Sequence, residues 1–210
     1  MDVLVIGTGG LAREFSAFFS DEINIIGFSS TEKIEFEKFK LPGRFFDSKI
    51  TPKIVGTKNA VLAIGDPIAK QTLSKKLKKL GFIFPNLVHP SSIMYTNINK
   101  ASQDGIIVSP NCVIGTDVSL GNHVYLNFMV GIGHDVVIED YVQVNSGAQI
   151  GGNVLIGEGV LVGSGSTIRE KLKIKKLSTI GSGSVVLSSV SEGITVIGNP
   201  ARRLKLPKIK

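Results

Sequence analysis

The chain has 210 residues, of which 42% are hydrophobic, with a formal net charge of +7 and a single cysteine. This length accommodates one large domain or two small ones with a substantial core. The lone cysteine excludes a disulfide framework and favours the cytoplasm. Since there is no long apolar run and no basic leader, we expect neither a membrane span nor a signal peptide.

The first ninety residues read as strands alternating with helices, which predicts a small parallel sheet. Strands are expected at residues 3–6, 24–28 and 61–64, and a helix over residues 11–19. A second helix begins after Asp66, a good N-cap followed by Pro67, and ends at Gly81.

A glycine loop follows the first strand. Gly7, Gly9 and Ala12 have the spacing of a dinucleotide fingerprint, in which backbone N–H groups at a helix N-terminus face a phosphate. The acidic residue expected about twenty positions later, to hold a ribose, is missing, because the second strand ends in Ser29 and Ser30. The loop therefore indicates either a nucleotide-bearing ligand other than NAD or a purely structural turn.

From Val108 to Val186 every sixth residue is aliphatic, a period that fits neither a helix nor an alternating strand. This is the hexapeptide signature of a parallel β-helix, in which three hexads form one coil and residue n lies over residue n+18. Leu126, Val144 and Val162 should then stack inside, about 4.8 Å apart. We call these aliphatic positions rungs. They are Val108, Ile114, Leu120, Leu126, Ile132, Ile138, Val144, Ile150, Ile156, Val162, Ile168, Ile174, Ile180 and Val186.

Small residues flank the rungs. The residue after a rung is often Gly or Asn, which suits a tight turn needing positive φ. These residues are Gly115, Gly121, Asn127, Gly133, Asn145, Gly151, Gly157, Gly163 and Gly181. Cys112 occupies the slim apolar slot two residues before a rung, so we interpret it as core packing rather than as a nucleophile.

Charge is unevenly distributed along the repeats. Residues 106–168 carry five acids and no Lys or Arg, whereas residues 169–210 carry ten bases against Glu170 and Glu192. Without aromatic interleaving or an RNA motif, this basic end does not indicate nucleic-acid binding. It favours a compact ligand with several phosphates, and a merely solvated basic face is the alternative.

Three histidines are present. We expect His89 to be structural and His123 to be a solvated turn residue. His134 is followed by Asp135 and stacks between Thr116 and Gly152 in the eighteen-residue register, which has the parts of an acyl-transfer site: a general base, a carboxylate that orients it, and an N–H for the oxyanion. A solvated turn histidine is the alternative.

A zinc carbonic anhydrase built on this fold would need three imidazoles converging on one metal. His89, His123 and His134 are separated by 34 and 11 residues, neither a multiple of 18 that would stack them, so we expect no metal site.

The whole chain resembles the sugar O-/N-acetyltransferase family, which includes a bacillosamine-pathway N-acetyltransferase and a sialic-acid O-acetyltransferase. The resemblance rests on residues 63–66 (AIGD), 84–93 (FPNLVHPSSI), 126–127, 133–135 and 198–202. It implies a Rossmann-like α/β domain over residues 1–84 and a left-handed β-helix over residues 85–210. It also implies a homotrimer whose active sites lie between neighbouring β-helices.

The resemblance implies roles for individual residues. His134 matches the general base, with Asp135 as its partner. The resemblance also implies a nucleotide-linked amino sugar as substrate and acetyl-CoA as co-substrate. Substrate contacts are expected from Gly7, Gly9, Gly10, Arg13, Ser29, Ser30, Gly65 and Asn127. Contacts to acetyl-CoA are expected from Asn145, Gly152, Arg202, Arg203 and Lys205.

The chain departs from the family at three places. The nucleotide loop, often Gly-Gly-His-Gly-Lys, reads Gly-Gly-Leu-Ala-Arg over residues 9–13. An Asp-Asp pair after the second strand is replaced by Ser29 and Ser30, and a histidine nine residues after the base is replaced by Gln143. The identity of the sugar and its nucleotide is therefore left open.

Our leading interpretation is an acetyl-CoA-dependent N-acetyltransferase acting on a nucleotide-linked amino sugar. One alternative is O-acetylation of a sugar such as a sialic acid, which would use the same base. A second alternative is a non-catalytic β-helical scaffold that senses a nucleotide. A trimer through the β-helices is expected because Val113, Val137, Leu155 and Leu161 should point outward as apolar surface.

Overall fold

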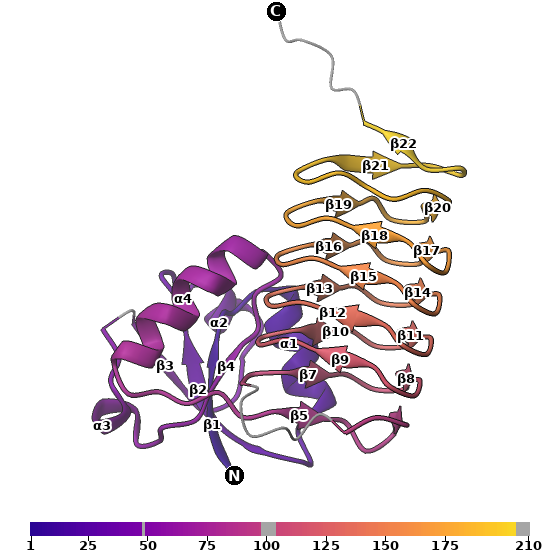
Figure 1. The fold of residues 1–210 in the computed structure, drawn as a ribbon. Helices are drawn as coiled ribbons and strands as arrows, with labels where there is room; N and C mark the ends of the chain where they lie inside the picture. The colour runs from indigo at the N-terminus through magenta and orange to yellow at the C-terminus, as the bar shows by residue number, and fades with distance from the viewer. Residues whose placement is uncertain (48, 98–103, 205–210) are drawn as a thin grey trace, which may run out of the picture.

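The computed structural model describes residues 1–47, 49–97 and 104–204, which form an α/β unit beside a β-helix (Figure 1). The α/β unit is a four-stranded parallel sheet in the order β3-β2-β1-β4. Its strands are β1 (Asp2–Ile6), β2 (Asn24–Ser29), β3 (Arg44–Phe46) and β4 (Ala60–Leu62). Its helices are α1 (Gly10–Phe18), α2 (Ile34–Lys38), α3 (Pro52–Val55) and α4 (Pro67–Lys79).

The predicted strands and helices of this unit are confirmed, and α2, β3 and α3 are additions. Asp66 caps α4 as expected, because its carboxylate accepts from the backbone N–H groups of Ile68 at 2.8 Å and Ala69 at 3.0 Å. The helix then presents Leu77 to a core under the sheet that includes Leu4 and Phe82. Among the described residues, no helix combines the length and the apolar character needed to cross a membrane.

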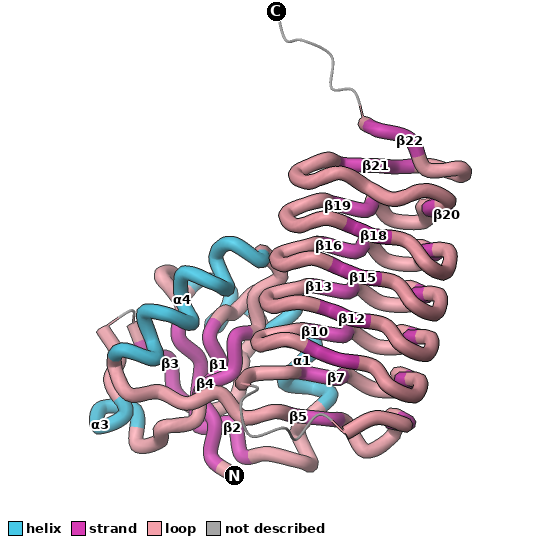
Figure 2. Tube along the Cα trace, in the orientation of Figure 1, coloured by secondary structure: helices cyan, strands magenta, loops and turns pink. Residues whose placement is uncertain are grey.

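The β-helix is three-sided, with short strands joined by turns (Figure 2). Its strands are parallel except for the last pair, residues 195–197 and 202–203, which is antiparallel. Face 1 consists of β5 (Leu87–Val88), β7 (Ile107–Val108), β10 (Tyr125–Leu126), β13 (Gln143–Val144), β16 (Leu161–Val162), β19 (Thr179–Ile180), β21 (Thr195–Ile197) and β22 (Arg202–Arg203). Face 2 consists of β6 (Ile93–Met94), β8 (Val113–Ile114), β11 (Gly131–Ile132), β14 (Gln149–Ile150), β17 (Thr167–Ile168) and β20 (Val185–Val186). Face 3 consists of β9 (Ser119–Leu120), β12 (Val137–Ile138), β15 (Leu155–Ile156) and β18 (Lys173–Ile174).

The eighteen-residue register is confirmed. Leu126 pairs with Val144, and Val144 pairs with Val162, as predicted. All fourteen rungs are buried in one continuous core, and Cys112 is buried with them as a free thiol. The interior is therefore a set of aliphatic stacks, and the surface is left to the residues that alternate with them.

The expected reason for the glycines after the rungs is wrong. Positive φ occurs three residues after a rung instead, for example at Asp135 (57°) and Asn153 (59°). A Cβ at Gly157 would stand 2.6 Å from the backbone nitrogen of Lys176, and one at Gly163 would stand 2.5 Å from that of Ser182. These two glycines are thus set by the close approach of the next coil, and not by the turn conformation.

The α/β unit packs against the lower part of face 1. Phe15 of α1 and Phe19, the C-cap of that helix, share a core with three residues that project outward from face 1: Leu87, Ile107 and Tyr125. Helix α4 follows the adjoining edge of the β-helix: Lys78 pairs with Asp104, Ser74 bonds to Tyr141 and Gln71 bonds to Glu158. The two parts are therefore joined by an apolar core and a polar seam.

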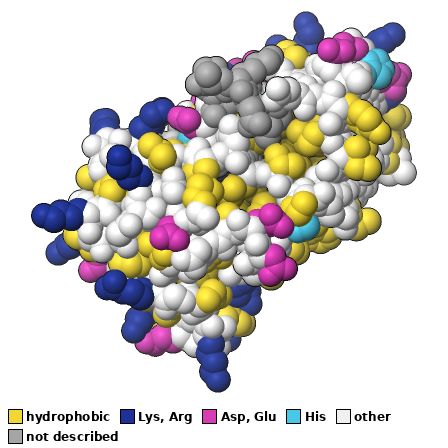
Figure 3. Space-filling view, turned by 90° about the horizontal axis from the view of Figure 1, so that it is seen from below, with side chains coloured by type: hydrophobic (Ala, Val, Ile, Leu, Met, Phe, Trp, Pro, Cys, Tyr) yellow, Lys and Arg dark blue, Asp and Glu magenta, His cyan; other side chains and the backbone are white. Residues whose placement is uncertain are grey.

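Two of the four residues expected to form exposed apolar surface do so clearly. Val113 on face 2 is 46% exposed and Val137 on face 3 is 41% exposed, whereas Leu155 and Leu161 are half-buried. Seen from below, Lys and Arg side chains stand around the α/β unit, and apolar side chains are exposed between them (Figure 3). Faces 2 and 3 thus offer apolar surface to a neighbour.

A buried lysine lies in the seam between the two parts. Lys70 of α4 is only 1% exposed, and its ammonium donates to Gln143 Oε1 at 3.0 Å and to the His123 carbonyl at 3.4 Å. The ring of Tyr125 lies 5.6 Å from the same nitrogen. Burial without a carboxylate partner lowers the pKa of Lys70 to about 7.

We therefore expect Lys70 to make stability depend on pH. The unfolded chain holds this proton up to a pKa of about 10.5, whereas the folded chain releases it near 7. Stability should consequently rise from pH 7 toward pH 10, and this gain should be lost as the pH falls from 10 to 7 and level off below 7, where both states hold the proton. Urea unfolding of the wild type and of Lys70→Met at pH 7, 8 and 9 measures this contribution. The slope should flatten in Lys70→Met and persist in Lys79→Met, an exposed control on the same helix, and equal slopes in all three proteins would contradict the assignment.

Candidate functional site

His134 stands on the corner where the chain passes from β11 to β12. Its Nδ1 lies 2.6 Å from Asp135 Oδ2, and the two side chains are 63% and 52% exposed. The coils above and below hold this turn, because Asp135 N–H donates to the Thr116 carbonyl and Asn153 N–H donates to the His134 carbonyl. Since the Asp135 carboxylate is an acceptor, it favours the tautomer with the proton on Nδ1, in which Nε2 is the nitrogen able to accept a proton.

Gly152 makes room for the imidazole. A Cβ at Gly152 would stand 2.6 Å from His134 Nε2 and 2.8 Å from its Cε1. The same slot holds Thr116, Glu170 and Ser188 in other coils, so the backbone accepts side chains there. The Gly152 N–H makes no backbone hydrogen bond among the described residues. The structure thus brings together His134, Asp135 and Gly152, as the eighteen-residue spacing predicts.

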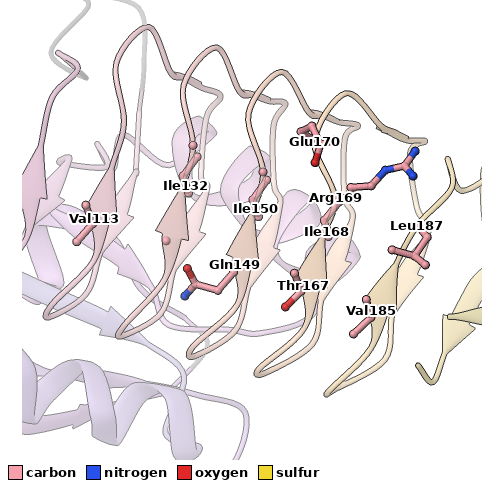
Figure 4. A pocket seen from close by; sticks show the side chains of 13 residues that line it. Val113, Ile132, Gln149, Ile150, Thr167, Ile168, Arg169, Glu170, Val185 and Leu187 are labelled. Carbon is pink, nitrogen blue, oxygen red and sulfur yellow. The ribbon is translucent and has the colours of Figure 1, made fainter. Parts of the chain in front are cut away.

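A groove of about 590 Å³ runs along face 2 beside this corner (Figure 4). Side chains project into it from four strands of face 2: Val113, Gln149, Thr167 and Val185. Gly131 of β11 lines it between Val113 and Gln149, and at the corner the lining continues through Gly133, Gly151, Arg169, Glu170 and Leu187. The groove therefore extends from beside His134 toward the C-terminal coils.

A second hollow of about 490 Å³ lies at the C-terminal end of the groove. Arg202 and Arg203 line it together with Ser188, Ser189 and Pro200. Ser188 occupies the His134 slot three coils later, a rise of roughly 14 Å. Lys205, which was predicted to act with these arginines, lies outside the described residues.

The glycine loop lines a crevice of about 610 Å³ at the carboxyl ends of the sheet strands, where β1 lies between β2 and β4. This is the topological switch point at which open α/β sheets bind ligands. Of the predicted residues, Gly7, Gly9, Gly10, Ser30 and Gly65 line it. A narrower cavity of about 200 Å³ adjoins it and is lined by Ser29, Ser30 and the apolar side chains of Ile50, Ile64 and Leu77.

Two predicted crevice residues are engaged elsewhere. Arg13 stacks on the ring of Phe39, with its guanidinium carbon 3.6 Å from the ring centroid. The Ser29 hydroxyl donates to the Asp47 carbonyl at 3.1 Å and is almost fully buried. Carboxylates that sequence reasoning missed, Glu32 and Glu35, enter the crevice instead.

Asn127 and Asn145 lie on a different corner from His134, between faces 1 and 2. Asn127 is buried, and its Oδ1 accepts from the backbone N–H of Phe128 at 2.8 Å. Asn145 Oδ1 accepts from Gln143, the residue that also holds Lys70. The predicted site residues therefore lie at three separate places within one chain: the Asn127 corner, the His134 corner and the crevice.

The other two histidines are structural. His89 Nδ1 lies 2.8 Å from Ser91 Oγ, and its ring meets Phe19 edge-on. The expectation that His123 is solvated is wrong: it is 6% exposed, stacks on Tyr141 and packs against Phe84. Burial lowers the pKa of His123 to about 4, so it is neutral at physiological pH. Across the described residues, no three His, Cys, Asp or Glu side chains are grouped as metal ligands.

Comparison with known proteins supports the fold. Residues 129–170 match the family model described as bacterial transferase hexapeptide (six repeats). No curated protein matches the sequence. Among solved structures, a mutant of perosamine N-acetyltransferase from Caulobacter crescentus, in complex with CoA and GDP-perosamine, has 22% identity and a TM-score of 0.82, covering 98% of this chain and 97% of that one.

Two further structures are similar over nearly the full length. The acetyltransferase domain of PglB from Neisseria gonorrhoeae FA1090, in complex with acetyl coenzyme A, has 23% identity and a TM-score of 0.79, covering 97% of this chain and 98% of that one. WeeI from Acinetobacter baumannii AYE has 22% identity and a TM-score of 0.75, covering 97% and 100%. These likenesses confirm the predicted fold, an α/β Rossmann-like domain followed by a left-handed hexapeptide β-helix.

Proposed function

We propose that this chain is an acetyl-CoA-dependent N-acetyltransferase that acts on the amino group of a nucleotide-linked amino sugar. The observation that carries the proposal is the His134–Asp135 pair, which is exposed at a corner of a hexapeptide β-helix. Gly152, in the next coil, leaves the space that the imidazole occupies. The hexapeptide transferase match at residues 129–170 spans this corner and supports it.

The chemistry is direct transfer with His134 as general base. The sugar amine attacks the thioester carbonyl carbon of acetyl-CoA, and His134 Nε2 accepts the proton that the nitrogen loses. Asp135 holds the imidazole through Nδ1 and stabilises it while it is charged. The Gly152 N–H donates to the oxyanion of the tetrahedral intermediate. The C–S bond then breaks, and the proton passes to the departing thiolate, giving the amide and CoA.

Acetyl-CoA is proposed to lie along the corner that begins at His134. The face 2 groove and the hollow at Arg202 and Arg203 follow one another along this corner. The thioester would lie at His134, the pantetheine arm would follow the groove, and the phosphates would meet the two arginines. Asn145 and Lys205 remain proposed contacts to the cofactor. Solved structures of similar fold in complex with acetyl coenzyme A or CoA support a CoA ligand for this chain.

The nucleotide sugar is proposed to occupy the crevice of the α/β unit. Its phosphates would face the N–H groups of the loop at Gly9 and Gly10, at the N-terminus of α1. Gly7, Ser30 and Gly65 would contact the rest of the nucleotide, and Arg13, Ser29 and Asn127 remain proposed substrate contacts. The perosamine N-acetyltransferase complex, which contains a nucleotide sugar, supports this class of substrate.

The proposed active site requires a second copy of the chain, and we expect a homotrimer. The crevice and His134 lie on separate parts of one chain, so a neighbouring β-helix is needed to complete a cleft at the His134 corner. The exposed Val113 and Val137 and the face 2 groove provide apolar surface for that contact. Light scattering at micromolar concentration measures the assembly, and a monomer would count against a shared cleft.

Replacing Arg202 and Arg203 by alanine should raise KM for acetyl-CoA roughly three- to tenfold and leave kcat nearly unchanged. Contacts to distant phosphates are equal in the ground state and the transition state, so they contribute uniform binding. The wild type should prefer CoA over dephospho-CoA in competition experiments, and the double variant should lose that preference. If the variant discriminated as the wild type does, the arginines would not contact the 3′-phosphate.

The proposed activity is tested by thiol release from acetyl-CoA in the presence of UDP-, GDP- and dTDP-linked amino sugars. Release that requires an amino-sugar nucleotide supports the N-acetyltransferase. Release only with a hydroxyl-bearing acceptor such as a sialic acid would support the O-acetyltransferase alternative. Nucleotide binding without any release would support the non-catalytic scaffold.

A further inference from the structure

Glu35 of α2 faces the glycine loop across the crevice. Its Oε2 lies 3.5 Å from the position that a Cβ on residue 9 would occupy, and the side chain is half-buried. Glu32, in the turn before α2, lines the same crevice. The first turn of α2 thus places the Glu35 carboxylate beside the glycine loop that connects β1 to α1.

The Glu35 carboxylate makes no hydrogen bond or ion pair within the described residues. By contrast, Glu37 on the same short helix pairs with Lys33 at 2.9 Å. The Ser29 hydroxyl at the end of β2 is already donated to the Asp47 carbonyl. Glu35 is therefore a half-buried acceptor that lines a ligand-sized crevice without a partner.

The chemistry of an ionised carboxylate selects its ligand group. It accepts hydrogen bonds and donates none, and it repels phosphate oxygens, so it does not itself bind a diphosphate. Two vicinal hydroxyls fit it, because each of its oxygens can accept one. In sheets of this strand order an acidic residue after the second strand takes the ribose hydroxyls, while the phosphates lie at the helix N-terminus.

We propose that Glu35 accepts hydrogen bonds from the ribose hydroxyls of the nucleotide and makes the crevice select ribonucleotides over 2′-deoxyribonucleotides. This assignment rests on the proposed function and narrows its substrate to sugars linked to ribonucleoside diphosphates. The acidic residue that would hold the ribose is missing at the end of β2, where Ser29 and Ser30 stand. Glu35, six residues beyond the end of β2, takes that role. Because the carboxylate lies beside Gly9, the phosphates are proposed to meet the loop on its Gly10 side, at the N-terminus of α1.

Calorimetric titration of the full chain tests this specificity. UDP, GDP, CDP and ADP are each compared with their 2′-deoxy counterparts, in buffer containing EDTA. For a nucleotide that binds, the wild type should prefer the ribose form roughly ten- to a hundredfold, because the deoxy form leaves one carboxylate oxygen unpaired. The preference should fall to near one in Glu35→Ala and persist in Glu37→Ala, the control on the same helix. Thermal unfolding verifies that each variant is folded.

The outcomes separate this inference from the proposed function. Equal affinity for ribose and deoxyribose forms in the wild type, or an unchanged preference in Glu35→Ala, would overturn the role of Glu35 and leave the acetyltransferase intact. Binding of every nucleotide that vanishes in EDTA would also overturn it, since the carboxylates would then be holding a cation. If acetyl-CoA bound and no nucleoside diphosphate did, both this inference and the nucleotide-linked substrate would fall.

Discussion

Replacing His134 by alanine is expected to lower kcat by roughly 10²–10⁴ and to leave CoA binding and oligomeric state unchanged. The side chain is exposed at a corner, and its burial contributes little to the core, so the loss should be catalytic and not structural. Steady-state kinetics, calorimetry with CoA and light scattering measure these three properties. Unchanged turnover would return His134 to a solvated turn residue.

The same variant identifies the acceptor. If the nucleophile is an amine, the loss caused by His134→Ala should shrink as the pH rises, because more of the substrate is then deprotonated without a base. A hydroxyl acceptor stays protonated across the accessible range and should show no such recovery. Rates of the wild type and the variant measured as one pH series therefore test the residue and the reaction together.

Replacing Gly152 by alanine is expected to reduce kcat by roughly 10², although the change adds a single methyl group. That methyl group would stand 2.6 Å from His134 Nε2, so the imidazole must leave its position above residue 152. The fold should tolerate the change, because Thr116 and Glu170 occupy the equivalent slot in neighbouring coils. Kinetics and thermal unfolding of Gly152→Ala measure the two effects.

A double-mutant cycle makes this prediction specific. In a His134→Ala background there is no imidazole to displace, so Gly152→Ala should have almost no further effect on kcat. Thr116→Ala, which changes the same slot in the preceding coil, on the other side of His134 from Gly152, should retain nearly wild-type activity. An additive loss in the double variant would show that residue 152 acts independently of the imidazole, through its N–H or through the backbone.

The β-helix was predictable in detail, because its core depends on a strict period. Once Leu126 and Val144 are assigned to one stack, the register places His134 over Gly152 without further information. The reason why glycine follows the rungs was not predictable. A residue without a Cβ can be required either by a positive φ or by the close approach of another backbone, and the sequence does not distinguish the two. Only the structure shows that Asp135 adopts the positive φ and that Gly163 lies where the next coil leaves no room for a Cβ.

The repeat pattern could not predict the contacts between the α/β unit and the β-helix. Tyr125 and Gln143 precede rungs and should point outward, yet α1 and α4 cover them. The apolar pair Ile107 and Tyr125, one coil apart on face 1, was the available signal for a docking surface. His123 was misjudged for the same reason, since its burial depends on Phe84 and Tyr141 and not on its own hexad. Glu35 was missed because a five-residue helix has too little periodicity to be recognised and displaces the carboxylate from its usual position.

The regular coils of a β-helix also fix distances along its corners. Each coil adds the same rise, so the spacing between two points on one corner depends only on the number of coils between them. His134 and Ser188 are separated by three coils. Deleting or inserting eighteen residues between them would change that spacing by about 4.8 Å while the aliphatic stacks, the turns and both end points kept their local structure. If acetyl-CoA lies along this corner as proposed, the length of carrier that fits between His134 and the two arginines changes in whole coils, and inserting or deleting coils would alter it without redesigning either end.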